Sequence, residues 1–203
     1  MQCTDKIKEE LIKHIEKNIT ERRKTHIYAV AEEAKKLAQR YGVDIEKAEF
    51  AALFHDIFRS VPEEKLNDYV KQLGLDDRYL NNANLAHSKI AAAIMERDYN
   101  IRDRDLLNAV SYHTTGRANM SNLEKVIYLA DAIEPNRNYP CVDKIRNIAY
   151  QDLDQACLLL LEHSISFIKS KNSYLDKDTL MARDYLVENN IITKKDQLLK
   201  VKT

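Results

Sequence analysis

The sequence predicts an all-α fold, a single-domain helical bundle of 203 residues. Apolar residues recur at steps of three and four along nearly the whole chain, which is the period of an amphipathic helix. Only 3 glycines and 3 prolines are present, too few for the turns of a many-stranded sheet. A chain of this length also buries enough surface for one real core.

Capping residues, glycines and apolar spacing mark the predicted helices of the first half of the chain. They are a first helix with Ile7, Leu11 and Ile15 after a cap at Thr4 or Asp5, a second from near Thr20 to Gly42, a third from Asp44 to His55-Asp56, a fourth from the capping box Ser60-Val-Pro-Glu63 to Gly74, and a fifth from Leu85 to Tyr99.

The same signals predict the helices of the second half of the chain. Its predicted helices are Asp103 to His113, the capping box Ser121-Asn-Leu-Glu124 to Pro135, and residues 142–149, 152–169 and 178–189. We expect residues 1–19 to form an N-terminal helix, 20–140 the core that carries the site, and 141–203 C-terminal helices packing on it. A charged tail from residue 194 is expected to fray.

Composition excludes several classes of protein. Lys plus Arg and Asp plus Glu both number 32, so the net charge is zero and no nucleic-acid surface is indicated. The longest apolar run, Ala156 to Leu161, is too short to span a membrane, and the charged segment Met1 to Ile15 is no signal peptide. The cysteines Cys3, Cys141 and Cys157 show no paired spacing, which predicts reduced thiols in a cytoplasmic protein.

The pair His55-Asp56 follows the apolar run Ala51 to Phe54, where a buried helix would otherwise carry only hydrocarbon. Burying a bare imidazole and carboxylate is costly, so both need a partner, and a metal ion is the simplest. Neighbours on a helix point about 100° apart and reach one ion only near a helix end or on a tilted helix. Phe58, Arg59 and Ser60 indicate such an end.

Other polar residues interrupt apolar faces on other predicted helices. Each has an ordinary alternative: a satisfied core histidine for His26, a helix cap for His87, and a cap or an arginine partner for Asp131. His113 lies on an inward face with Val110 and Leu106. Together, imidazoles and carboxylates on facing helices predict a transition-metal site. We expect His14 to lie at the surface and His163 in the core.

The order of these residues resembles the HD superfamily of metal-dependent phosphohydrolases, which are all-helical enzymes. The resemblance implies that a first set of residues binds metal and that His87 and His113 bind a second metal or contact substrate. The implied first set is His26, His55, Asp56 and Asp131.

Longer motifs resemble one branch of that superfamily, the YqeK-like bacterial symmetrical diadenosine tetraphosphate hydrolases. They are Ala51-Ala-x-x-His-Asp56, Tyr112-His-Thr-Thr-Gly-Arg117, Ile133-Glu-Pro-Asn-Arg137 and Val142-Asp-x-x-Arg146. The resemblance covers residues 20 to 190 and implies cleavage of the dinucleotide to two ADP. It favours iron, with manganese or a similar ion as the alternative, at one or two ions per site. Arg59 stands where the branch commonly has lysine, and the two cations bind phosphate differently.

In the mechanism that the resemblance implies, the metal lowers the pKa of a bound water, and the resulting hydroxide attacks phosphorus in line. Asp56 serves as ligand and proton acceptor, and His87 and His113 either protonate the leaving phosphate or complete a second metal site. The expected phosphate ligands are Arg23, Arg59, Arg117 and Arg137. Thr114, in loop 114–120, and the segment Lys171 to Asp176 are expected near the nucleoside.

Alternatives remain within and outside this class. Other HD phosphohydrolases act on a nucleoside monophosphate, a deoxynucleoside triphosphate or a guanosine alarmone, and the missing Gly-Tyr-Pro motif disfavours a cyclic dinucleotide. Outside it, the chain would be a non-catalytic metal- and nucleotide-binding regulator or a helical interaction module. We expect a nucleotide as partner, neither nucleic acid nor membrane, and leave a homodimer open.

Overall fold

The computed structural model describes the backbone of residues 2–200 and the side chains of residues 6–189. Over that span the chain is all-helical and contains no strand, which confirms the predicted fold class. Its elements are α1 (Gln2–Asn18), α2 (Glu21–Tyr41), α3 (Ile45–Phe54), α4 (Glu63–Gln72), the short 3-10 helix η1 (Asp77–Tyr79), α5 (Ala83–Asp98), α6 (Arg104–Ser111), α7 (Asn122–Ile133), α8 (Val142–Ala149), α9 (Leu153–Ser170) and α10 (Lys177–Lys200).

Several predicted helix ends are confirmed. Gly42 ends α2 with a φ of 65°, a left-handed conformation that glycine adopts without strain. The Asp44 side chain accepts a hydrogen bond from the backbone N–H of Lys47 at the start of α3. Ser121 and Glu124 form both halves of the predicted capping box of α7.

Other predicted ends are wrong. α1 already begins at Gln2, so Thr4 and Asp5 do not precede it. The Ser60–Glu63 capping box does not form because Pro62 is the N-cap of α4 and offers no side-chain acceptor. The last helix continues to Lys200 because no glycine or proline interrupts it, so the backbone of 194–200 is helical rather than frayed. The side chains of that charged tail lie outside the described residues.

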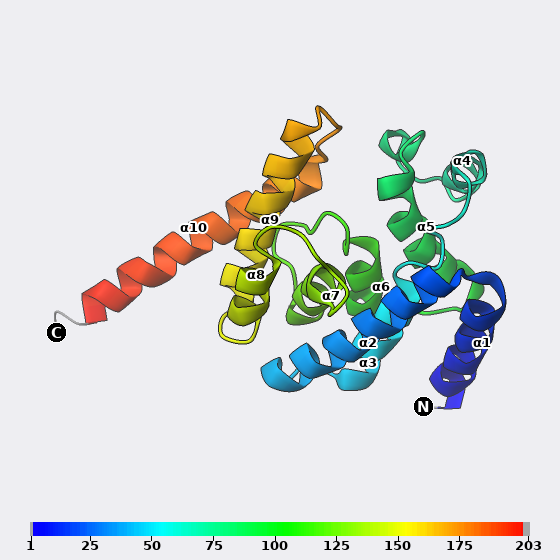
Figure 1. Ribbon diagram of the computed structural model, residues 1–203, viewed down its shortest axis with the longest axis horizontal. Helices are drawn as coiled ribbons and strands as arrows, with labels where there is room; N and C mark the ends of the chain where they lie inside the picture. Colours follow the sequence, from blue (N-terminus) through cyan, green and yellow to red (C-terminus); the bar gives the residue numbers. More distant parts are fainter. Residues whose placement is uncertain (1, 201–203) are drawn as a thin grey trace.

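One large hydrophobic core holds most of the helices together. It includes Ile27 on α2, Phe54 on α3, Ile127 on α7 and Leu161 on α9, all fully buried or nearly so. A smaller cluster joins α4, η1 and α5 around Leu66. Figure 1 shows α2 and α3 crossing below α7, with α8 and α9 on one side and α4 and α5 on the other. α10 leads away from the body toward the C-terminus.

No helix within the described residues has both the length and the apolar character needed to cross a bilayer. The core contains residues from both sides of position 140, such as Ile127 and Leu161. Within it, α2 packs against both α3 and α7, and α6 packs against α5 and α7. The candidate site lies where these helices meet.

Candidate metal centre and active site

Four histidines from four parts of the fold converge at one point. His26 lies in the second turn of α2, His55 is the C-cap of α3, His87 lies in the second turn of α5 and His113 follows α6. All four are buried. The Nε2 atoms of His26 and His55 are 3.4 Å apart, and those of His87 and His113 are 3.2 Å apart.

The hydrogen bonds of the outer ring nitrogens fix the tautomers. The Nδ1 atoms of His55, His87 and His113 donate to backbone carbonyls of their own segments, at 2.6, 3.1 and 2.8 Å. The Nδ1 of His26 faces the Glu134 carboxylate at 3.2 Å. With the proton on Nδ1, the Nε2 atoms of His55, His87 and His113 present a lone pair to the centre, as a metal ligand requires, whereas the Nε2 of His26 also faces the Asp131 carboxylate at 3.0 Å.

The local sequence explains two of these hydrogen bonds. α3 ends at Phe54 and α6 ends at Ser111, so the carbonyls of their last turns lack helical donors. The imidazoles of His55 and His113 supply donors to Ala52 and Val110. The predicted helix end at His55-Asp56 is therefore confirmed, and it aims both side chains of the pair at the same centre. The helix predicted to reach His113 stops two residues earlier.

Asp56 lies between the two histidine pairs. Its Oδ2 is 3.6 Å from the Nε2 atoms of both His26 and His55. Its Oδ1 is 3.2 Å from the Nε2 of His87 and 3.9 Å from that of His113. Each carboxylate oxygen of Asp56 thus faces one histidine pair.

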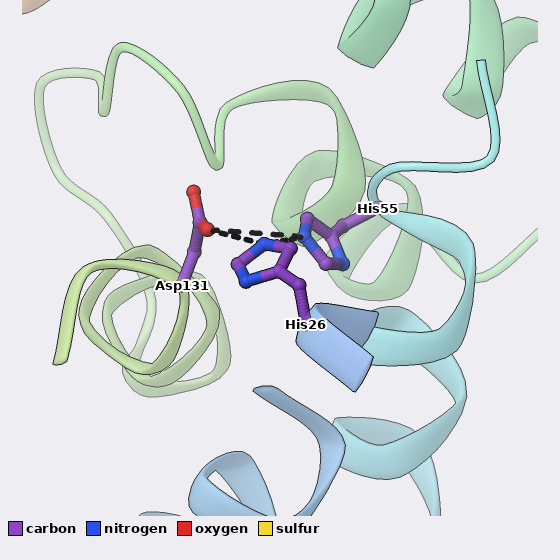
Figure 2. Close-up of side chains that lie close together, drawn as sticks. All are labelled: His26, His55 and Asp131. Carbon is purple, nitrogen blue, oxygen red and sulfur yellow. Dashed lines mark hydrogen bonds and ion pairs between the residues drawn. The ribbon is translucent and has the colours of Figure 1, made fainter. Parts of the chain in front are cut away.

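Asp131 completes the first group from the last turn of α7. Its Oδ1 lies 3.0 Å from the Nε2 of His26 and 3.9 Å from that of His55. Figure 2 shows this carboxylate facing the two imidazole rings. Unlike the buried histidines, its side chain is 22 % exposed, so the centre opens to solvent on this side.

The geometry fits a divalent metal ion. Two groups offer one ligand atom per residue within 4.8 Å of one another: His26, His55 and Asp131, and His55, Asp56 and His113. Ligand atoms at about 2.1 Å from a shared ion are separated by about 3.0 Å at right angles and about 4.2 Å across the ion. The Nε2 atoms of His26 and His55 lie 3.0 and 3.9 Å from Oδ1 of Asp131, and both lie 3.6 Å from Oδ2 of Asp56, so these distances fall within that range.

The protonation states also suit a metal. Burial lowers the pKa of His55, and it lowers that of His113 to about 3, so both rings are neutral at pH 7. Burial alone would raise the pKa of Asp56, but the nearby His55 and His87 hold it well below its usual range. The pKa of Asp131 is likewise lowered, because the hydrogen bond from His26 and the charge of Arg137 outweigh burial.

His26 behaves differently from the other rings. Burial opposes its charged form, but the hydrogen bond and the charge of Asp131 outweigh it and raise the pKa of His26. Metal binding must therefore displace a proton from this ring more often than from His55 or His113.

Two of the four predicted arginines reach the centre. Arg23 forms an ion pair with Asp56, and Arg137 forms one with Asp131. Arg59 instead donates to the side-chain oxygen of Asn84 at 2.6 Å. Arg117 donates to both carboxylate oxygens of the buried Glu124, at 2.6 and 2.5 Å. Phosphate binding by Arg59 and Arg117 stays a prediction.

Two residues that support the site, Glu134 and Arg146, have no predicted role beyond their place in the motifs. Glu134 is almost fully buried, orients His26, and accepts hydrogen bonds from the backbone and side chain of Asn136. Arg146 donates to the carbonyls of Ile133, Glu134 and Arg137, each at 2.8 Å. The signal for Glu134 was an acidic residue directly after the apolar end of a helix.

Two cavities adjoin the cluster and share Arg22, Asn136 and Arg137. The polar cavity, of about 630 Å³, also contacts His26 and the first turn of α2. The apolar cavity, of about 780 Å³, also contacts His113 and Asp131. Thr114 lines the apolar cavity, and its place near the nucleoside stays a prediction.

Two ordinary alternatives can now be settled. His87 is not a helix cap, because α5 begins four residues before it and its ring is buried in the cluster. His163 was expected in the core but is only partly buried and lines the apolar cavity. The isolated thiols agree with the prediction where they are described: Cys157 is buried and Cys141 exposed, both unpaired, while the side chain of Cys3 lies outside the described residues.

A family model of the HD domain matches residues 23–136. This span contains every residue of the histidine and aspartate cluster. The chain belongs to the HD-domain family.

Relatives of this HD domain protein extend over nearly the whole chain. A Bacillus subtilis (strain 168) protein named bis(5'-nucleosyl)-tetraphosphatase, symmetrical, is 37 % identical over 90 % of this chain and 99 % of its own. A Halalkalibacterium halodurans protein of the same name is 38 % identical over 85 % of this chain and 93 % of its own.

A solved structure supports the same fold. It is described as a predicted HD superfamily hydrolase involved in NAD metabolism from Clostridium acetobutylicum. It superposes with a TM-score of 0.84 at 37 % identity, covering 89 % of this chain and 97 % of that one.

Proposed function

We propose that this HD-domain protein is a metal-dependent phosphohydrolase that cleaves dinucleoside tetraphosphates symmetrically, converting diadenosine tetraphosphate into two molecules of ADP. The convergence of four imidazole Nε2 atoms on the two oxygens of Asp56 carries the catalytic part of the proposal. The relatives named as symmetrical tetraphosphatases support the substrate, because they match this chain almost end to end.

In this proposal His26, His55, Asp56 and Asp131 hold the metal. A bound divalent ion supplies Lewis-acid chemistry, polarising a phosphate oxygen and making water acidic enough to act as a nucleophile near neutral pH. The ligand set of imidazoles and carboxylates without sulfur suits iron or manganese, and we favour iron. The residues also set the charge: both carboxylates are ionised at neutral pH, because the pKa of each lies well below its usual range.

The contacts of His113 bear on whether it donates a proton or binds metal. Its Nδ1 donates to the carbonyl of Val110, and burial lowers its pKa to about 3, so its Nε2 presents a lone pair toward Asp56 at neutral pH. We therefore assign His113 and His87, which face Oδ1 of Asp56, to a second metal position. Asp56, which faces both histidine pairs, would contribute a ligand oxygen to each metal position.

The chain offers phosphate ligands beside the cluster. Arg23 and Arg137 already pair with its two carboxylates, so their guanidinium groups lie where a polyphosphate must pass. Thr20 and Arg22 line the polar cavity at the start of α2, a helix of 21 residues whose N-terminal dipole favours anions.

The position of the cluster supports cleavage in the middle of the substrate. The polar cavity includes His26 and the apolar cavity includes His113, so the centre lies between them. A dinucleoside tetraphosphate with its central phosphates at the cluster can extend one half into each cavity. We also propose a cytoplasmic location and leave homodimer formation to measurement.

The test is incubation of the purified protein, loaded with iron or manganese, with diadenosine tetraphosphate, followed by anion-exchange separation of the products. We expect ADP alone. Asp56→Ala should abolish ADP formation while circular dichroism shows intact helices, and Asp98→Ala, at the exposed end of α5, is the matched control.

Other products would change the assignment. AMP with ATP would show asymmetric cleavage and overturn the symmetric pose. Absence of product, with metal bound, would overturn this substrate and direct attention to other nucleotides. Normal turnover by Asp56→Ala would overturn the site itself.

A further inference from the structure

The apolar cavity has aromatic side chains along one wall. The rings of Tyr139 and His163 stack with their centroids 5.1 Å apart and their planes at 27°. Phe167 lines the same cavity, and 57 % of its surface is exposed. Tyr139 comes from the loop after α7, whereas His163 and Phe167 come from α9.

Tyr139 is partly buried against the hydrophobic core, but the core does not account for His163 and Phe167. α9 packs Leu158, Leu161 and Ile165 inward, and these residues are buried. His163 and Phe167 are four residues apart and share a different face of α9, toward the cavity. A large exposed aromatic ring in a concave site is typical of ligand binding.

The cavity joins this aromatic wall to the catalytic centre. His113 and Asp131 line it at the cluster, and Arg137 lines both cavities. A ligand that fits must therefore be anionic at one end and flat and apolar at the other. A volume of about 780 Å³ is sufficient for a nucleoside.

Polar atoms are available between the two ends. The Oγ1 atom of Thr114 is buried and, among the described residues, has no hydrogen-bond partner, although Thr114 lines the cavity. Ser164 and Asn138 line it as well. Hydroxyl and amide groups of this kind can bind a ribose or the edge of a base.

We propose that the apolar cavity is the base-binding subsite for one nucleoside of the substrate, with the nucleobase stacked on the wall of Tyr139, His163 and Phe167. This inference rests on the proposed function for the identity of the substrate. Stacking tolerates any nucleobase because every base has a π-face, so this wall supplies affinity rather than strong base selectivity.

The test is calorimetric titration of the manganese-loaded protein with ADP and, separately, with inorganic pyrophosphate, which has no base. Phe167→Ala and His163→Ala should each raise the Kd for ADP about tenfold, and leave the Kd for pyrophosphate unchanged. Phe167→Tyr should retain the affinity for ADP. Met181→Ala is the matched control, because Met181 is a large apolar side chain that is 54 % exposed but does not line the cavity.

Kinetics provides a second measurement. With diadenosine tetraphosphate, Phe167→Ala should raise KM with little change in kcat, since the ring contacts the base in both the ground state and the transition state. Unchanged ADP affinity in both alanine variants, or an equal loss for pyrophosphate, would overturn the base subsite.

The failures of the two proposals are distinguishable. A wild-type protein that cleaves the dinucleotide while the variants bind ADP normally overturns only the subsite. If the wild-type protein cleaves no dinucleotide but the variants lose ADP affinity, the base subsite stands and the proposed substrate is overturned. A wild-type protein that binds pyrophosphate but not ADP overturns both.

Discussion

Replacing Glu134 by glutamine should weaken metal binding, although Glu134 itself is not one of the proposed ligands. Its Oε1 faces the Nδ1 of His26 at 3.2 Å, and its Oε2 accepts hydrogen bonds from the backbone and side chain of Asn136, at 2.6 and 3.0 Å. A glutamine must point its single oxygen at the Asn136 donors. Its NH₂ group then faces His26 and favours the tautomer with the proton on Nε2.

The size of this effect follows from the hydrogen bond that is lost. To bind metal, His26 must return the proton to Nδ1, where it opposes the NH₂ donors of the glutamine. A buried donor left unpaired costs about 1–3 kcal/mol, or about 5- to 150-fold in affinity. This agrees with the 10- to 100-fold losses typical for groups that orient metal-bound histidines.

Competition with a chelator of known affinity for manganese measures this loss. Glu33→Gln is the matched control, because Glu33 is a buried glutamate on α2 that contacts no histidine of the cluster. Its partners are the hydroxyl of Tyr150, at 2.6 Å, and the ammonium of Lys36, at 3.3 Å. Unchanged manganese affinity in Glu134→Gln, with circular dichroism like that of the wild type, would refute the assigned role of Glu134.

Four further predictions concern the centre and its support. Metal affinity should rise with pH until the raised pKa of His26 is passed, with about one proton released per ion below it, measured by calorimetry in buffers of different ionisation enthalpy. In the metal-free protein, the charged His26–Asp131 pair stabilises the fold at pH values below the ordinary histidine pKa. This stabilisation is lost as pH rises through the raised pKa of His26. A free energy of unfolding that does not change with pH in this window would count against the pairing. Manganese at a free concentration one hundred times its Kd should add about 2.7 kcal/mol to the free energy of unfolding and about 5–10 °C to Tm, and a chelator should remove both. Arg146→Ala should lower the free energy of unfolding by about 2–4 kcal/mol in urea titrations, because three carbonyls lose their donor; an unchanged midpoint would show that water replaces the side chain at no cost.

The fold was predictable because most helix boundaries depend on local chemistry. Gly42, Asp44 and Ser121 act within one turn of their own positions, so their effect is visible in the sequence. The predicted capping box at Ser60 is wrong because Pro62 lies in the same segment, and the two residues compete as the start of the helix. The 3-10 helix at Asp77–Tyr79 is too short to produce a periodic pattern.

The residues that form the site were predictable from the sequence, but the contacts between them were not. Burial is costly for imidazoles and carboxylates, so His26, His55 and Asp131 stood out wherever they interrupted an apolar face. No local rule shows that the two oxygens of Asp56 face different histidine pairs. Glu134 and His26 are 108 positions apart, so their contact depends on how α2 packs against α7.

The cationic residues were the hardest to assign. Arg117 and Arg137 both follow motifs that suggested phosphate binding, yet Arg117 pairs with Glu124 whereas Arg137 lines both cavities. An exposed arginine can turn to any acidic neighbour, and only the assembled fold determines which neighbour is near. A role for Phe167 was not predictable, because an exposed aromatic ring indicates binding only once a cavity is known to lie beside it.

The two cavities beside Arg137 are unlike, whereas the two ends of the proposed substrate are identical. A symmetric molecule can therefore enter in either direction with equal success. A dinucleotide with two different bases loses this equivalence, although its products are the same in both directions. Turnover in ¹⁸O-labelled water would reveal the choice, because the heavy oxygen attaches to only one of the two diphosphates. The asymmetry of the protein would thus appear in which product carries the isotope rather than in the identity of the products.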